Sequence, residues 1–211
     1  MGDGKSWSEG VDEENGNYDY LMFANLDFNH PEVVKEMEKW GIWVSRELDL
    51  DGMRLDAIKH INDDFIRKFL AAVRKERGAD FYAVGEYWKQ DLESLDDYLK
   101  EERYKVDLFD VPLHYNMYQA SKQGRDYDLS KILDGTLVQN HPTLAVTFVD
   151  NHDEDRLASK LRNPEHLYSV YTLLYTLPGI PSIYYGSEWG MEGKRTRESD
   201  DMLRPCIHIA D

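Results

Sequence analysis

Leu-Asp-Gly-Met-Arg-Leu-Asp-Ala-Ile-Lys-His-Ile, residues 50–61, is the segment from which the architecture of the chain can be inferred. Met53–Leu55 has the pattern of a short strand, interrupted by Arg54 and followed by Asp56. Residues two apart on an extended chain project from the same face, so these two charged side chains should lie side by side. Burying both is costly unless they pair. The segment therefore indicates a strand end with an ion pair, which serves either the sheet edge or a functional site.

The composition is that of an ordinary globular protein, and it limits the kinds of partner. The 211 residues carry a formal net charge of −16. Nucleic acids and anionic membranes attract positive surfaces, so neither is expected as a partner, whereas a neutral ligand or a bound cation is. The single cysteine, Cys206, excludes an internal disulfide. No apolar run reaches the length of a membrane span, and the first residues lack a signal-peptide pattern.

Strand-like and helix-like patterns alternate along the chain. Pro31 suits the first turn of a helix capped by Asn29 or His30, and Asn62 suits the cap of a second helix that ends at Gly78. The alternation favours right-handed βαβ crossovers and a parallel sheet. The expected strands are 53–55, 81–84, 106–111, 144–149 and 180–184, and residues 186–211 are expected to form a long loop.

Three carboxylates, Asp56, Glu86 and Asp153, each stand just after one of these strand patterns. In parallel α/β sheets, chemistry gathers outside the carboxyl ends of the strands. Carboxylates held close together differ in pKa, which supplies the acid and the nucleophile or base of glycoside hydrolysis. A two-carboxylate magnesium site is the alternative. Trp88 favours a sugar, because aromatic rings stack on pyranose faces, although a packing tryptophan gives the same pattern.

Oxygen-bearing side chains are also close together near the amino terminus, at Asp19, Asn25 and Asp27. Closely spaced oxygen ligands on an irregular segment suit a hard cation such as calcium. Turns stabilised by Asx hydrogen bonds give the same residue pattern. The residues by themselves leave both interpretations open.

Three motifs, in this order, resemble the α-amylase family of glycoside hydrolases. They are Gly-Met-Arg-Leu-Asp-Ala-Ile-Lys-His at 52–60, Gly-Glu-Tyr-Trp at 85–88 and Phe-Val-Asp-Asn-His-Asp at 148–153. Residues 1–153 as a whole are similar to bacterial liquefying-type α-amylases. Residues 154–211 resemble another branch of the family, α-glycosidases that act on oligosaccharides.

The resemblance implies a retaining mechanism on α-1,4-glucan. Asp56 would be the nucleophile, Glu86 the general acid and then base, and Asp153 the residue that stabilises the transition state. Arg54 would orient Asp56, and His152 would bind sugar beside Asp153. The leaving-group side of the cleft would be lined by Lys59, His60 and Trp88.

The resemblance also implies a calcium site. Its ligands would include Asp19, Asn25, Asp27 and the main-chain oxygen of His60. Asn25 stands where the liquefying enzymes usually carry aspartate. The loss of one negative charge is expected to weaken the site.

A (β/α)8 TIM barrel has eight strands in about 250 residues. In the family, the Asp56 motif ends the fourth strand. The expected fold is therefore α/β, a partial (β/α)8 barrel from about strand 4 to strand 8. Residues 1–28 would end an inserted loop domain, and 29–211 would form the carboxyl-terminal part of the catalytic barrel. The change of resemblance near 150–153 leads to the hypothesis of a fragment or a chimera.

The expected function is endo-hydrolysis of α-1,4-glucosidic bonds in starch or maltodextrin, with little activity from the short chain alone. One alternative is an α-glucan transglycosylase or oligo-α-glucosidase with the same three carboxylates. Another is a non-catalytic glucan-binding relative. Because part of a barrel has open strand edges, self-association through these edges is also expected.

Overall fold

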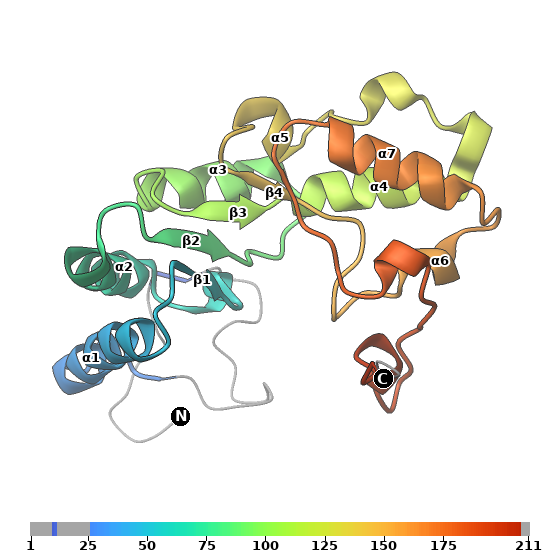
Figure 1. Cartoon of the computed structure of the whole chain (residues 1–211). Helices are drawn as coiled ribbons and strands as arrows, with labels where there is room; N and C mark the ends of the chain where they lie inside the picture. Colours follow the sequence, from blue (N-terminus) through green and yellow to red (C-terminus); the bar gives the residue numbers. More distant parts are fainter. Residues whose placement is uncertain (1–9, 12–25, 208–211) are drawn as a thin grey trace. The chain divides into compact units, whose positions relative to one another are not determined.

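A computed structural model of the chain describes residues 10–11 and 26–207. The chain divides into two compact units, of which one lies within 1–88 and 93–108 and the other within 89–92 and 109–211. Figure 1 follows the chain through both units.

Helices and strands alternate, as the sequence predicts. The first seven elements are α1 (Pro31–Glu47), β1 (Gly52–Leu55), η1 (Ile58–His60), α2 (Asp63–Arg77), β2 (Tyr82–Gly85), α3 (Leu92–Glu101) and β3 (Asp107–Phe109). The next seven are α4 (Val111–Gln123), η2 (Gly124–Asp126), η3 (Leu129–Lys131), α5 (Leu137–Asn140), β4 (Ala145–Thr147), α6 (Leu157–Lys160) and α7 (His166–Thr176). The last three are β5 (Ile180–Pro181), η4 (Ser187–Trp189) and η5 (Asp201–Leu203).

The strands pair in parallel. In the first unit β1 pairs with β2, and β2 pairs with β3. In the second unit β4 pairs with β5. Within each unit the strand order follows the order of the chain. Parallel neighbours joined by helices are the α/β arrangement expected from the sequence.

In the first unit, α2 begins and ends where its capping residues predict. The side chain of Asn62 accepts a hydrogen bond from Phe65 N, and Gly78, with a φ of +113°, ends the helix. Residues that share one face of α2 are buried in the core: Phe65, Ile66, Phe69, Leu70 and Val73. Such a stripe with helical spacing is what holds an amphipathic helix in place.

The packing of α1 differs from the expectation. Pro31 opens the helix, but the expected side-chain cap is absent, because His30 is the N-cap residue and makes no capping hydrogen bond. The residues buried in α1 are Gly41 and Ser45. A Cβ at Gly41 would lie 2.3 Å from Phe69 of α2, so the helices approach through the glycine. Trp40 and Leu48, apolar residues with helical spacing in the sequence, are exposed.

The second unit is held by an apolar cluster between α4 and α7, which run side by side in Figure 1. Leu113 and Met117 of α4 pack with Val170 and Leu174 of α7. Burial of such side chains contributes about 1.5–3 kcal/mol each.

Three expectations for this part of the chain were wrong. The predicted strand 106–111 ends at Phe109, because Asp110 caps α4 and Pro112 stands in the first turn of that helix. The last strand is only Ile180–Pro181. The segment 186–211, predicted as loop, contains two short 3-10 turns, η4 and η5.

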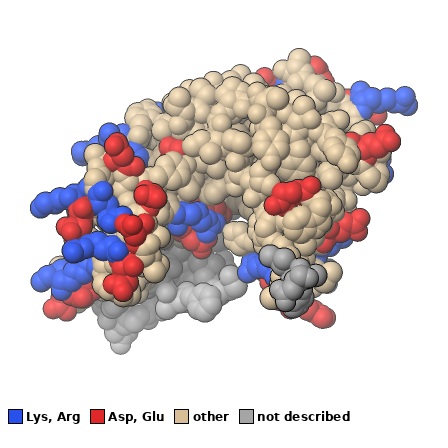
Figure 2. Space-filling view, in the orientation of Figure 1, with Lys and Arg blue, Asp and Glu red and all other residues tan. Residues whose placement is uncertain are grey.

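Charged side chains of both signs are interspersed around α1 and α2 on the face that Figure 2 shows. Among the described residues, no helix combines the length and apolar character needed to cross a bilayer.

Candidate active site

Asp56 and Glu86 follow the paired strands β1 and β2. Leu55 lies opposite Gly85 in this pair. The hydrogen bonds continue past the strand ends, from Glu86 N to Leu55 O at 2.9 Å and from Ile58 N to Glu86 O at 3.1 Å. The structure therefore brings these two carboxylic residues together at one edge of the first unit, as the sequence predicts.

The turn that follows β1 directs a backbone amide at Glu86. Ala57 has a φ of +48°, a conformation that residues with a side chain seldom adopt and that is often found at functional sites. Its N–H donates to Glu86 Oε2 at 2.9 Å. A hydrogen bond from a fixed amide to a carboxylate restrains the orientation of that carboxylate.

Gly85 leaves the space that this turn needs. Ile58, in η1, is fully buried. A Cβ at position 85 would lie 2.2 Å from Ile58 Cδ1 and 3.3 Å from Leu108 Cδ2. Any side chain at 85 would therefore require the end of the Ile58 side chain to move.

Arg54 contacts both carboxylates. Its Nη1 donates to Asp56 Oδ1, and its Nη2 lies 3.8 Å from Glu86 Oε2. The ion pair predicted between Arg54 and Asp56 is confirmed. The Asp56 side chain is 71% exposed and that of Glu86 only 15%. Two carboxyl groups in such different surroundings can take different chemical roles.

The residues predicted to bind sugar near Glu86 lie in the same unit. Lys59 Nζ donates to the main-chain oxygen of Trp88 at 3.0 Å, which joins η1 to the segment after β2. His60 ends η1, and its N–H donates to Ala57 O at 2.9 Å. A cavity of about 190 Å³ is lined in part by Lys59, Ile61 and Tyr87.

In the second unit, Asp153 lies on a loop that a short-range turn holds. Asn151 Oδ1 accepts hydrogen bonds from Asp153 N at 2.9 Å and from Glu154 N at 3.0 Å, which is an Asx turn. His152 Nε2 is 3.3 Å from Asp153 Oδ2. The two side chains therefore lie beside each other, as the sequence predicts.

Asp150, in the same motif as Asp153, has a structural role. It is buried and accepts hydrogen bonds from Leu157 N at 2.9 Å and from the Ser187 hydroxyl at 3.1 Å. Burial raises the pKa of its carboxyl group, and these hydrogen bonds oppose the shift. It thereby joins α6 and η4 to the Asp153 loop.

The predicted calcium site is only partly within the described residues. Asp19 and Asn25 lie outside them. Asp27 Oδ1 accepts from Asn29 N at 3.1 Å, as expected of an Asx turn. The described part of the chain contains no group of three His, Cys, Asp or Glu side chains placed to hold a metal ion. Calcium therefore stays a prediction, as does His60 as one of its ligands.

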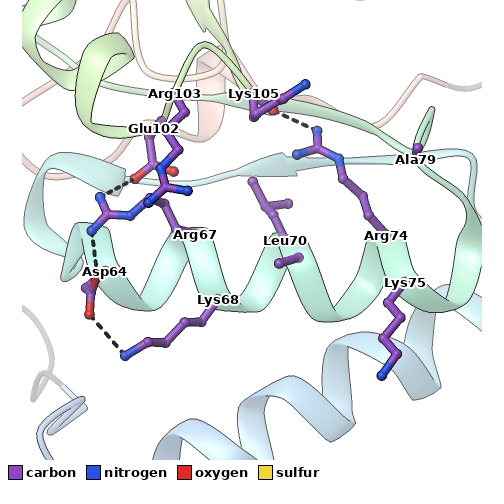
Figure 3. A pocket seen from close by; sticks show the side chains of 11 residues that line it. Asp64, Arg67, Lys68, Leu70, Arg74, Lys75, Ala79, Glu102, Arg103 and Lys105 are labelled. Atoms are coloured by element: carbon purple, nitrogen blue, oxygen red, sulfur yellow. Dashed lines mark hydrogen bonds and ion pairs between the residues drawn. The ribbon is translucent and has the colours of Figure 1, made fainter.

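A groove of about 680 Å³ lies along α2 (Figure 3). Its basic residues serve the fold: Arg67 donates to Glu101 O at 3.1 Å, and Arg74 donates to Phe81 O and Lys105 O at 3.1 and 2.7 Å. Burial raises the pKa of Glu102, which also lines the groove, to about 7. The residues that line the groove include none of the predicted site residues.

Two arginines near Asp153 were missed by sequence reasoning. Arg204 donates from Nη2 to Asp153 Oδ1 at 2.6 Å. Arg156 is fully buried and donates to Tyr185 O and Leu203 O. Arg204 lies 51 positions from its partner, so no local pattern indicates the contact.

Comparison with known proteins identifies the family of the chain. The model of the α-amylase catalytic domain matches residues 3–207. A glucan 1,4-alpha-maltohexaosidase of Bacillus sp. (strain 707) is 47% identical over 90% of the chain, which covers 37% of that protein. An alpha-amylase of Bacillus licheniformis is 43% identical over 92% of the chain, which covers 39% of that protein.

Among solved structures, an alpha-amylase from Geobacillus thermoleovorans, complexed with acarbose, is 30% identical to the chain. The TM-score is 0.74, over 88% of this chain and 42% of that one. The expected fold class, part of a (β/α)8 barrel, is thereby confirmed. The chain spans well under half the length of these relatives. With its catalytic-domain match and these identities, the chain belongs to the α-amylase family of glycoside hydrolases.

Proposed function

We propose that the chain carries part of the catalytic barrel of a retaining α-glucan hydrolase that cleaves α-1,4-glucosidic bonds within starch or maltodextrin. The observation that carries this proposal is the contact of Arg54 with both Asp56 and Glu86 at paired strand ends. Retaining hydrolysis needs two carboxyl groups with different roles on one sugar. The open Asp56 and the enclosed Glu86 suit that division.

In the first step Asp56 attacks the anomeric carbon, while Glu86 donates its proton to the departing glycosidic oxygen. The bond from sugar to oxygen breaks as the bond from sugar to Asp56 forms. In the second step Glu86 takes a proton from water, which displaces Asp56 from the sugar. Arg54 orients the nucleophile, and Ala57 N–H orients the acid.

The resemblance of the motifs gives Asp153 and His152 the role of binding sugar hydroxyls as positive charge develops on the ring. Lys59, His60 and Trp88 would contact the sugar that leaves. The names of the relatives support a malto-oligosaccharide or α-1,4-glucan as substrate: one is a maltohexaosidase, and the Geobacillus structure holds acarbose.

Replacement of Glu86 with glutamine tests the proposal. Glutamine has nearly the shape of glutamate, but it cannot donate the proton to the glycosidic oxygen or take one from water. The kcat should therefore fall by about 100-fold or more. Glu93→Gln, in the exposed first turn of α3, is the matched control and should match the original chain. Equal turnover of maltoheptaose by both variants would contradict the proposal. Mass spectrometry of the products separates hydrolysis from transfer to a sugar acceptor.

We also propose that the chain by itself is weakly active and associates with copies of itself. Trp40 and Trp43 on α1 are 49% and 57% exposed, and Tyr168 and Tyr175 on α7 are 79% and 60% exposed. Large exposed apolar side chains favour association. Light scattering after size exclusion should show oligomers; a uniform monomer that rapidly hydrolyses maltoheptaose would refute this.

A further inference from the structure

Arg204 contacts both residues of the His152–Asp153 pair. Its Nη2 donates to Asp153 Oδ1 at 2.6 Å, and its Nε donates to the main-chain oxygen of His152 at 3.0 Å. The same Nη2 lies 2.6 Å from Asp200 Oδ2. One guanidinium therefore restrains a side chain and the backbone of the residue before it.

The main chain on both sides of Arg204 is anchored. Leu203 is fully buried, and its carbonyl oxygen accepts from Arg156 Nη2 and from the Tyr184 hydroxyl, both at 3.0 Å. The carbonyl oxygen of Pro205 accepts from the Tyr185 hydroxyl at 2.8 Å. The main chain is therefore held in place at Leu203 and at Pro205, the residues on either side of Arg204.

A buried arginine organises these anchors. The guanidinium carbon of Arg156 lies 3.9 Å from the centre of the Tyr184 ring, as in a cation–π contact. The main-chain N–H of Arg156 donates to Gly193 O at 2.9 Å. A Cβ at Gly193 would lie 2.4 Å from Met202 O, so the segments that contain Gly193 and Met202 pack closely at this glycine.

The Arg204–Asp153 contact is better suited to orientation than to stability. The side chains are 45% and 48% exposed, and an ion pair so open to water contributes little to folding. The planar guanidinium presents donors in fixed directions, which lets it hold a carboxylate and a carbonyl together. A lysine ammonium in its place has no such fixed geometry.

From this geometry we propose that Arg204 is a positioning residue for Asp153, which acts on the reaction by fixing that carboxylate and the His152 backbone. The inference rests on the proposed function, because Asp153 matters to the reaction only if the chain is a glycosidase. Loss of the contact would leave Asp153 able to rotate. Misplacement of a reacting group by about 1 Å costs about 100-fold in rate.

Arg204→Met and Arg204→Lys test the proposal in the full chain, with Arg197→Met, an exposed arginine of the same segment, as control. We expect kcat for maltoheptaose to fall about 10- to 100-fold in Arg204→Met, with KM changed by less than about threefold. Arg204→Lys should recover only part of the loss. In the Asp153→Asn background, Arg204→Met should cost far less, because the two residues act as one unit.

Backbone NMR provides a readout that does not depend on activity. The amide resonances of His152 and Asp153 should shift in Arg204→Met and stay in place in Arg197→Met. If Arg204→Met and Arg204→Lys both leave these resonances and kcat unchanged, the positioning role is wrong. If the original chain is as inactive as Glu86→Gln, the proposed function fails, and the NMR shifts alone decide whether Arg204 positions Asp153. Should Arg204→Met fail to fold, Arg204→Lys gives the same comparison.

Discussion

The space at Gly85 allows a stringent test of how the site is built. In Gly85→Ala the new Cβ meets Ile58 Cδ1 at 2.2 Å, far inside van der Waals contact. Overpacking of a buried site costs about 1–3 kcal/mol of unfolding free energy. Ile58→Val removes the same Cδ1 atom, at a cost of about 0.5–1.5 kcal/mol on its own. If Cδ1 is the obstacle, the double variant should lose less than the sum by about 1 kcal/mol or more.

Urea unfolding followed by circular dichroism gives the four free energies of this cycle. The rate on maltoheptaose is the second readout, because Ile58 follows Ala57, whose amide donates to Glu86, and we expect repacking of Ile58 to weaken that hydrogen bond. We expect Gly85→Ala to lose about tenfold or more in kcat and the double variant to recover part of it. Free energies that add within about 0.5 kcal/mol would refute the packing explanation.

Three further outcomes are expected. Asp110 is buried and accepts from Leu113 N, Leu137 N and Val138 N, so Asp110→Ala should destabilise the chain by about 3 kcal/mol or more in urea unfolding. The exposed cap variant Asp128→Ala should cost about 1 kcal/mol or less. A loss no larger in Asp110→Ala would contradict this account. Burial raises the pKa of Glu102 from 4.5 to about 7, so stability should fall as pH rises through that range, by at most about 3 kcal/mol. Glu102→Gln should flatten this slope, and an unchanged slope would show that Glu102 is not its source. Calcium, unlike magnesium, should raise the melting temperature after treatment with EDTA if the predicted calcium site forms; no difference between the ions would count against it.

The helices and strands were largely predictable, because hydrophobic spacing and capping residues are local signals. Asn62 and Gly78 bound α2 as expected. The predictions failed where a side chain within a strand-like pattern caps a helix, or where the packing depends on residues far apart in the sequence. Asp110 uses its carboxylate to cap α4, which ends β3 early. Gly41 brings α1 onto α2 through the face without large side chains, so Trp40 faces outward.

The site shows the same division. Arg54 lies in β1 and Asp56 directly follows the strand, two residues later, so their ion pair agrees with the period of an extended chain. Glu86 joins them because Leu55 and Gly85 are register partners in neighbouring parallel strands. The sequence alone thus determined the family, the alternation of elements and the placement of Asp56 and Glu86 after neighbouring strands. The positive φ at Ala57 and the reach of Arg204 to Asp153 across 51 positions came only from the tertiary structure. The physical reason is that both depend on how buried neighbours, such as Ile58 and Arg156, fill the space around them.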